Sequence, residues 1–202
     1  MHDIKRYRDL GIRIPRGLLL YGEPGVGKTI MARSIADERI NLVELRAADC
    51  CEDEKDIAIR EAFNKAKENA PSVLLLDELD KIAGTSRHFY MEGNDDVKKI
   101  LLQELDKLTD DDAVLVVATC NIVECIGNTL LRAGRFDRQM EIKKPDEDTR
   151  KKIVKLYFDK LKIKRNINIE YLAKIMHGCT GAEIECIINE AAIYATENNK
   201  KA

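Results

Sequence analysis

The sequence predicts a three-layer α/β domain with a parallel sheet, followed by a small all-helical domain. Three apolar runs, at residues 18–21, 73–76 and 113–118, have the length of strands and are separated by segments with helical periodicity. A run that is apolar at every position is typical of a strand buried on both faces, as in a parallel sheet. After Lys144-Pro145-Asp146 the pattern is helical only, so we place the domain boundary between residues 143 and 144.

Strands and helices alternate along the first domain, 1–143, as a parallel sheet with crossover helices requires. Helical spacing of Ile59, Phe63 and Ala66 predicts a helix over 54–69. The other elements expected there are helices over 28–37 and 95–107, strands over 42–45 and 139–142, a short helix with a turn over 130–138, and a mobile loop over 84–93. This alternation predicts helices on both faces of one sheet.

The second domain, 144–202, is expected to be a helical lid. Helices are predicted near 147–161, 168–176 and 181–198, and Thr180-Gly181-Ala182-Glu183 is a capping-box pattern that marks the start of the last one. The buried stripe of this last helix is expected to consist of Ile184, Ile187, Ile188, Ala191, Ala192 and Ala195.

The composition narrows the class of protein. The chain has 202 residues, is 45% hydrophobic and 35% charged, and carries a net charge of -2. This is enough apolar material for a core, and the absence of a basic block does not favour nucleic acid as the main partner. No apolar run reaches about 18 residues and no signal peptide is visible, so we expect no membrane segment in this chain. Six cysteines without a C-x-x-C pair argue against a zinc site and favour free thiols in a reducing compartment. We therefore expect a cytoplasmic location, or the cytosolic part of a membrane-anchored protein.

A glycine-rich loop follows the first strand and precedes a helix. Its pattern, G-x-x-x-x-G-K-[ST], is that of a phosphate-binding loop in the expected strand–loop–helix context. Glycines let the backbone N–H groups point inward, and the helix N-terminus adds its positive dipole end. Lys28 should reach the β- and γ-phosphates, and the Thr29 hydroxyl should hold Mg²⁺. The predicted cofactor-binding residues here are Gly22, Glu23, Pro24, Gly25, Val26, Gly27, Lys28, Thr29 and Ile30.

Two carboxylates end the buried strand over 73–76. In a parallel sheet they lie at the carboxyl edge, where such sheets bind ligands. Asp77 is expected to hold Mg²⁺ directly or through water, together with Thr29. Glu78, whose side chain should turn to the other side, is our candidate for activating the attacking water. The alternative is that both residues merely end a strand in solvent.

Polar residues after the third apolar strand are further candidates. Asn121 is placed to touch the γ-phosphate or the water, although an asparagine after a strand is also a common turn residue. Arg132, Arg135 and Arg138 lie close together in the sequence. They form either a solvated basic turn or an arginine finger supplied to another subunit, and spacing alone leaves both interpretations open.

Taken together, these motifs resemble those of AAA+ ATPases over nearly the whole chain. Within that superfamily, the chain is similar to the ATPase module of FtsH-type membrane-anchored zinc proteases at residues 7–11 through 14–17, 135–139, and 189–192 with 199–201. The resemblance implies a ring, usually a hexamer, with ATP at subunit boundaries. It implies Asn121 as the sensor residue, and Arg132 and Arg135 as fingers that reach the neighbour's γ-phosphate. It also implies that Gly181 and Ala182 pack near the adenine.

The chain departs from the family pattern at several places. The family's pore loop, which grips a threaded polypeptide, has an aromatic residue, whereas residues 47–53 have none. Gly127 stands where the family usually has Asp, and Ala133 replaces the proline of the family's R-P-G-R motif. Residues 105–108 read L-D-K-L in place of L-D-G-F. This chain contains neither the zinc protease domain nor the upstream segment that contacts adenine.

The sequence therefore predicts Mg²⁺-dependent ATP hydrolysis by a ring-forming module coupled to remodelling of protein substrates. The alternatives are an ATP-dependent assembly or scaffold module that threads no peptide, and the ATPase half of an FtsH-like metalloprotease. The expected partners are ATP or ADP, further copies of the chain in a homo-hexamer, and a protein substrate, but not nucleic acid.

Overall fold

The computed structural model describes residues 15–36, 39–50, 54–83, 93–161 and 167–197. By its internal contacts the chain forms two compact units. The first consists of Met1–Gly22 and Lys28–Glu141, and the second of Glu23–Gly27 and Ile142–Ala202. Most of the phosphate-binding loop is therefore grouped with the helical unit.

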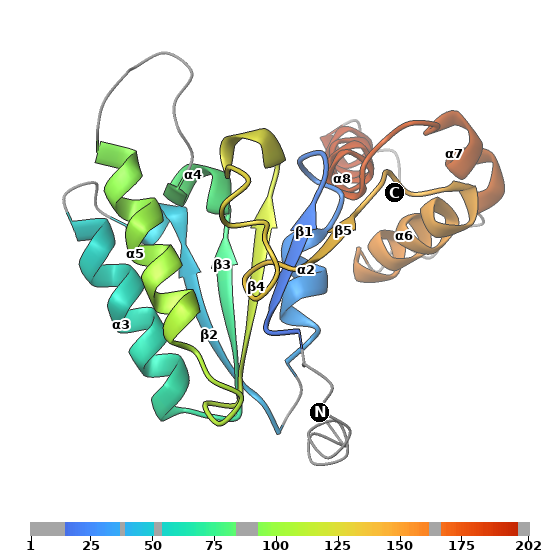
Figure 1. The fold of residues 1–202 in the computed structure, drawn as a ribbon. Coiled ribbons are helices and arrows are strands. Elements are labelled where there is room, and N and C mark those ends of the chain that lie inside the picture. Colours follow the sequence, from blue (N-terminus) through green and yellow to red (C-terminus); the bar gives the residue numbers. More distant parts are fainter. Residues whose placement is uncertain (1–14, 37–38, 51–53, 84–92, 162–166, 198–202) are drawn as a thin grey trace. The chain divides into compact units, whose positions relative to one another are not determined.

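The first unit contains a five-stranded sheet in the order β2-β3-β4-β1-β5 (Figure 1). The strands are β1 (Gly17–Tyr21), β2 (Asn41–Arg46), β3 (Ser72–Asp77), β4 (Val114–Cys120) and β5 (Arg138–Glu141). Every pairing is parallel, which confirms the predicted parallel sheet. Tyr21 aligns with Cys120, and Arg46 aligns with Asp77, so the carboxyl ends of these strands lie along one edge.

β3 is buried at every position, as its apolar run predicts. Leu74, Leu75 and Leu76 are fully buried, and burial of each such side chain contributes about 1.5–3 kcal/mol. Successive side chains along a strand point to opposite faces of the sheet. Leu74 and Leu76 join the main hydrophobic core, whereas Leu75 and Asp77 lie on the opposite face. The core therefore fixes the direction in which the carboxylate of Asp77 points.

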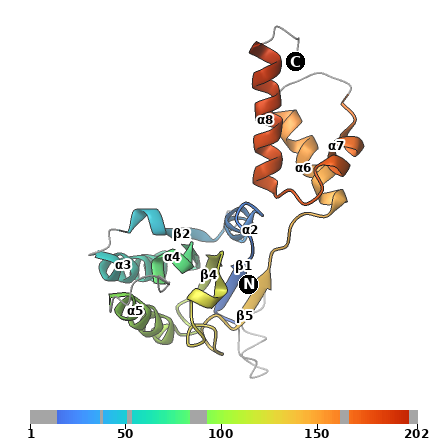
Figure 2. The same ribbon diagram turned by 90° about the horizontal axis from the view of Figure 1, so that it is seen from above.

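Helices cover both faces of the sheet. α3 (Lys55–Glu68) buries Ile59 and Phe63 in the main core, and α5 (Gly93–Lys107) packs beside it. Figure 2 shows these helices on one face and the short α2 (Lys28–Arg33) on the other. α4 (Leu79–Ala83), which the sequence did not predict, follows β3 directly. The arrangement is the predicted three-layer α/β fold.

Three predictions for this unit were wrong or fall outside the description. α2 ends at Arg33 and not at residue 37. Residues 126–137 form turns and bends without the short helix expected over 130–138. Gly127 and Gly134 adopt φ values of 85° and 90°, a conformation that a right-handed helix does not contain. The loop predicted over 84–93 lies outside the described residues except for Gly93.

The second unit is helical, with α6 (Glu147–Lys160), α7 (Ile169–Ile175) and α8 (Gly181–Glu197). The predicted capping box is confirmed: the Thr180 N–H donates to the Glu183 carboxylate at 2.7 Å, and the Glu183 N–H donates to Thr180 Oγ1 at 3.3 Å. The small core of this unit contains Val154, Met176, Ile184 and Ile188.

The buried stripe predicted for α8 was too wide. Ile187 is 43% exposed and Ala191 is also exposed, because α6 covers only a narrow side of α8. Among the described residues, no helix is both long and apolar enough to cross a membrane.

Candidate active site

The glycine-rich loop has the backbone that its sequence predicts. Gly22, Gly25 and Gly27 adopt φ values of 145°, 79° and 100°, which favour glycine. A Cβ at Gly25 would lie only 3.0 Å from both the Ala182 side chain and the Thr180 hydroxyl, so this position excludes a side chain on two grounds. The Gly25 carbonyl accepts a hydrogen bond from the Ala182 N–H at 3.1 Å. The loop is therefore fixed against the start of α8 within the second unit.

Gly181 and Ala182 thus lie beside the phosphate-binding loop. Glu23 forms an ion pair with Lys144 at 2.9 Å, also within this unit. Among the other loop residues predicted to bind the cofactor, Pro24 is exposed and Val26 is half-buried. Ile30, in the first turn of α2, is 70% exposed and contributes little to the core.

Lys28 is the first residue of α2 and is only 7% exposed. Its ammonium donates to the Gly22 carbonyl and to Asn121 Oδ1, each at 2.8 Å. Burial lowers the pKa of Lys28, and the nearby carboxylates Asp80, Asp77 and Glu78 oppose that shift. The structure therefore brings together two predicted site residues, from the loop and from the end of β4.

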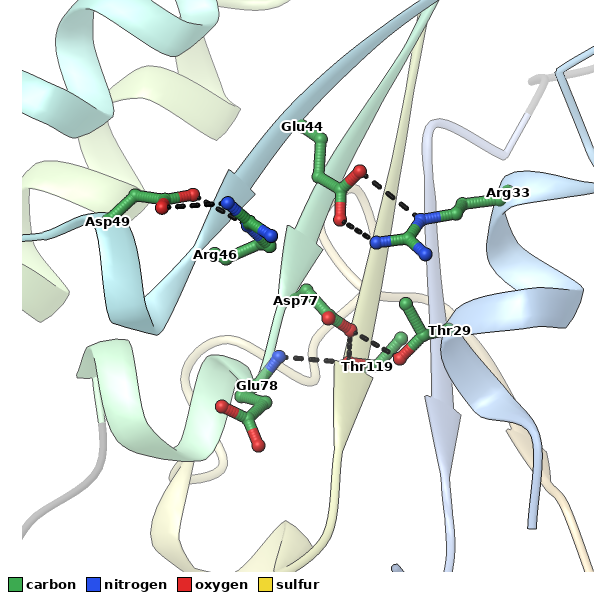
Figure 3. A network of polar contacts seen from close by, with 8 residues as sticks. All are labelled: Thr29, Arg33, Glu44, Arg46, Asp49, Asp77, Glu78 and Thr119. Atoms are coloured by element: carbon green, nitrogen blue, oxygen red, sulfur yellow. Dashed lines mark hydrogen bonds and ion pairs between the residues drawn. The ribbon is translucent and has the colours of Figure 1, made fainter. Parts of the chain in front are cut away.

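Asp77 receives two hydroxyl hydrogen bonds on the same oxygen (Figure 3). Thr29 Oγ1 donates to Asp77 Oδ1 at 2.8 Å, and Thr119 Oγ1 donates to it at 2.6 Å. Thr119 is a site residue that sequence reasoning missed. The available signal was its place at the end of the third apolar run, two residues before Asn121.

The chemistry of these donors fits Mg²⁺. A hard cation prefers oxygen ligands, and Mg²⁺ usually takes one or two protein oxygens, completing its octahedron with water and substrate phosphates. The Asp77 carboxylate and the Thr29 hydroxyl supply such oxygens next to the loop. No further protein ligand is required.

Glu78 points in a different direction from Asp77, as Figure 3 shows. Its φ of 60° is uncommon for a residue with a side chain and costs about 1–3 kcal/mol. Its N–H donates to Thr119 Oγ1 at 2.9 Å, and its carbonyl accepts the first hydrogen bonds of α4. Its carboxylate forms an ion pair with Lys81 at 2.6 Å. Thr119 and α4 therefore hold the backbone that directs this side chain.

The arginines are not joined to this cluster. Arg135 makes two hydrogen bonds to Asp106 on α5, at 2.9 and 2.8 Å, and donates to the Thr129 carbonyl at 2.7 Å. That guanidinium lowers the pKa of Asp106 by hydrogen bonding. The Arg132 side chain is exposed. Within the described part of the chain, neither arginine hydrogen-bonds to Lys28, Thr29, Asp77 or Glu78.

Comparison with family models agrees with this arrangement. Residues 18–144 match the model of the "ATPase family associated with various cellular activities (AAA)". Residues 166–202 match the model of the AAA+ lid domain.

Curated relatives resemble the chain over almost its full length. It is 35% identical to ATP-dependent zinc metalloprotease FtsH 3 of Petrotoga mobilis, with 100% of this chain and 32% of the relative covered. It is 39% identical to ATP-dependent zinc metalloprotease FtsH of a Sulfurovum species, covering 98% of this chain and 31% of the relative. It is 36% identical to the proteasome-activating nucleotidase of Saccharolobus solfataricus, covering 96% of this chain and 51% of the relative.

The chain thus spans about a third of the length of the FtsH relatives and about half of the nucleotidase. The family match covers the loop, the strand that ends in Asp77 and the segment with the arginines. The chain belongs to the ATPase family associated with various cellular activities.

Proposed function

We propose that this chain is a Mg²⁺-dependent ATPase module in which residues 1–143 bind and hydrolyse ATP and residues 144–202 form the lid. One observation carries the proposal. Lys28 and Thr29 are consecutive residues of the phosphate loop, and each hydrogen-bonds to another predicted site residue at a strand end: Lys28 to Asn121, and Thr29 to Asp77. A chance sequence match to the loop would not require these partners to lie within 2.8 Å.

Each residue has a distinct role in this proposal. The loop N–H groups and the Lys28 ammonium bind the β- and γ-phosphates. Thr29 and Asp77 hold Mg²⁺, which neutralises negative charge on the phosphate oxygens when bound. Gly181 and Ala182, next to the loop, contact the adenine.

The attacking water requires two further groups. Glu78 leaves its ion pair with Lys81 and accepts a proton from the water. Asn121, already hydrogen-bonded to Lys28, orients the water or contacts the γ-phosphate. The exposed position of the Lys81 side chain makes the ion pair weak, so it opposes this movement only slightly.

The charge that develops on the γ-phosphate requires a further cation besides Lys28, and among the described residues neither Arg132 nor Arg135 hydrogen-bonds to the cluster. We propose that Arg132 and Arg135 supply it to a neighbouring copy in a homo-hexameric ring, as fingers. In this arrangement hydrolysis moves the lid and the adjacent subunits. The module acts in the cytosol, where ATP and reduced thiols are available.

The substrate is proposed to be protein, remodelled with the energy of ATP. The names of the relatives support this: one group is an ATP-dependent protease and the other activates a proteasome. There are two alternatives to this remodelling function. One is that the chain is the ATPase half of an FtsH-like metalloprotease. The other is that it is an ATP-dependent assembly module that threads no peptide.

The assembly alternative is favoured by one observation. Residues 47–53 contain no aromatic side chain, and the described part of this segment begins with a short 3-10 turn, Ala47–Asp49. This segment therefore has no aromatic side chain that could contact a threaded peptide.

The experiment is to measure ATP hydrolysis with Mg²⁺, alone and with an unfolded protein added. Hydrolysis that the unfolded protein stimulates supports the remodelling function. Unstimulated hydrolysis together with nucleotide-dependent oligomerisation supports the assembly module. Absence of both ATP binding and hydrolysis contradicts the proposal as a whole.

A further inference from the structure

Two arginines lie next to Asp77 on its face of the sheet. Arg33 follows Thr29 by four residues on α2, so both side chains project from the same side of that helix. Arg46 is the last residue of β2 and is the Cα partner of Asp77 in the sheet register. Both guanidiniums are therefore in the neighbourhood of the carboxylate proposed to hold Mg²⁺.

Each of these arginines is held by another carboxylate through two hydrogen bonds (Figure 3). Glu44 accepts from Arg33 at 2.6 and 3.2 Å. Asp49 accepts from Arg46 at 2.7 and 2.9 Å. Glu44 is the register partner of Leu75, two residues before Asp77, so its carboxylate lies on the same face as that of Asp77.

Electrostatics agree with this proximity. Hydrogen bonding and charge from Glu44 raise the pKa of Arg33, and the charge of Asp77 adds a smaller increase. Hydrogen bonding and charge from Asp49 likewise raise the pKa of Arg46, and the charge of Asp77 adds a smaller increase. The field of Asp77 thus attracts both cations, while closer carboxylates bind them.

A free guanidinium at this position would compete with a metal. Arginine and carboxylate form forked, charge-assisted hydrogen bonds that are about twice as strong as neutral ones. Among the described residues, the hydroxyls of Thr29 and Thr119 donate hydrogen bonds to Asp77, and both are neutral. An arginine that displaced them would occupy the carboxylate oxygens and cancel the charge that Mg²⁺ requires.

We propose that Glu44 and Asp49 are positioning residues that hold Arg33 and Arg46 away from Asp77, which keeps its carboxylate available to Mg²⁺. This inference rests on the proposed function, because it assumes that Asp77 binds the metal. In this inference the ion pairs Arg33–Glu44 and Arg46–Asp49 contribute to metal affinity and not to stability alone.

The test measures binding of Mn²⁺, as a spectroscopic substitute for Mg²⁺, to the protein saturated with a non-hydrolysable ATP analogue. Electron paramagnetic resonance reports the free Mn²⁺. Glu44→Gln and Asp49→Asn are each expected to weaken Mn²⁺ binding about fivefold, the size of a ~1 kcal/mol electrostatic interaction. Circular dichroism checks that the variants remain folded, and because the two pairs share no hydrogen bond, either one alone can test the inference.

The double variants distinguish this role from simple bracing. Removing the released cation as well, in Glu44→Gln with Arg33→Met, is expected to restore Mn²⁺ affinity to within about twofold of the unmodified protein. The same holds for Asp49→Asn with Arg46→Met. If instead the pairs only brace α2 and β2, each double variant remains as weak as its single variant, and the inference is overturned.

Asp96→Asn is the matched control, since it removes the carboxylate partner of Lys99 on α5 and should leave Mn²⁺ binding unchanged. Unaltered binding in Glu44→Gln and Asp49→Asn would also overturn the inference while leaving the proposed function intact. Failure of the unmodified protein to bind Mn²⁺ with the analogue would contradict the proposed function itself.

Discussion

The phosphate-loop cluster and the arginine segment differ in how complete they are within one chain. Lys28 and Thr29 already contact the residues with which they are proposed to act. Arg135, in contrast, is bonded to Asp106 on α5, and Arg132 is exposed. The fold assembles one half of the proposed machinery, and the other half is proposed to act on a second molecule.

The physical reason lies in the elements that carry each set. Asp77 is the last residue of the buried strand β3, and Glu78 and Asn121 come directly after β3 and β4, so the paired strands fix their positions. The arginines lie in a segment of turns between β4 and β5. Turns tolerate rearrangement at lower cost than a buried strand, which suits residues that are proposed to reach across an interface. Variants in both regions test this difference.

The largest effect is expected from Arg132→Ala combined with Arg135→Ala. Without the fingers, the transition state loses their charge stabilisation, and the turnover number of the assembled protein should fall about 10³–10⁵-fold. Nucleotide affinity should stay within about twofold, since the fingers act on the transition state. Steady-state hydrolysis and calorimetry measure the two quantities.

Arg138→Ala, a change in the third arginine of the segment, is the control for this variant. It lies on β5 and is exposed, and its removal should have little effect on turnover. Turnover that survives in the double variant would rule out fingers acting between subunits.

The next effect in size is expected from Glu78→Gln. The amide cannot accept the proton of the attacking water, so turnover should fall about 10²–10⁴-fold while ATP binding is retained. Single-turnover hydrolysis and equilibrium binding separate the two. Glu61→Gln, an exposed change on α3, serves as control. A normal hydrolysis rate in Glu78→Gln would show that another group is the base.

Lys28→Ala should reduce nucleotide affinity about a hundredfold or more, because charge-assisted hydrogen bonds to two phosphates are lost. Isothermal titration calorimetry with an ATP analogue measures the loss. Lys65→Ala, on the exposed side of α3, controls for the change in net charge. Unchanged affinity in Lys28→Ala would refute the assignment of the loop.

The smallest effect concerns Asp106→Asn, which releases Arg135. The Asp106 side chain is 54% exposed and that of Arg135 is 22% exposed, so solvent screens the pair in part and the melting temperature should fall by only about 1–2 °C near pH 7. Arg135 lowers the pKa of Asp106, so the stabilisation is complete above the unfolded-state pKa and is lost as pH falls through the folded-state value. The difference between variant and unmodified protein should therefore shrink below about pH 4 and in high salt. A difference that grew on acidification would show that the Asp106 carboxylate is not the stabilised form.

Much of the fold followed from local patterns. The run of leucines before Asp77 predicts a strand buried on both faces, because no position in it tolerates solvent. The capping box at Thr180 predicts the start of α8 for an equally local reason. The segment over 130–138 was mispredicted because positive φ at Gly134 replaces helical geometry, which the apolar spacing of its neighbours does not reveal.

The proposed site was predictable only in part. Lys28, Thr29, Asp77 and Asn121 have motif positions, and their contacts follow from the order of adjacent strands. The Glu44–Arg33 contact depends on which face of the sheet α2 covers and on the register of β2 against β3. A short motif encodes neither the position of α2 nor this register, so these neighbours of Asp77 can be identified only from the structure.

The hydrogen bond from the Ala182 amide to the Gly25 carbonyl has a consequence for the energetics of binding. It joins the loop proposed to carry phosphate to the first turn of α8, with a contact too close for any bulkier residue at Gly25. By thermodynamic reciprocity, a phosphate that orders the loop also orders that turn. A molecule that stiffens the turn from outside, without touching nucleotide, then raises the affinity for phosphate by the same factor.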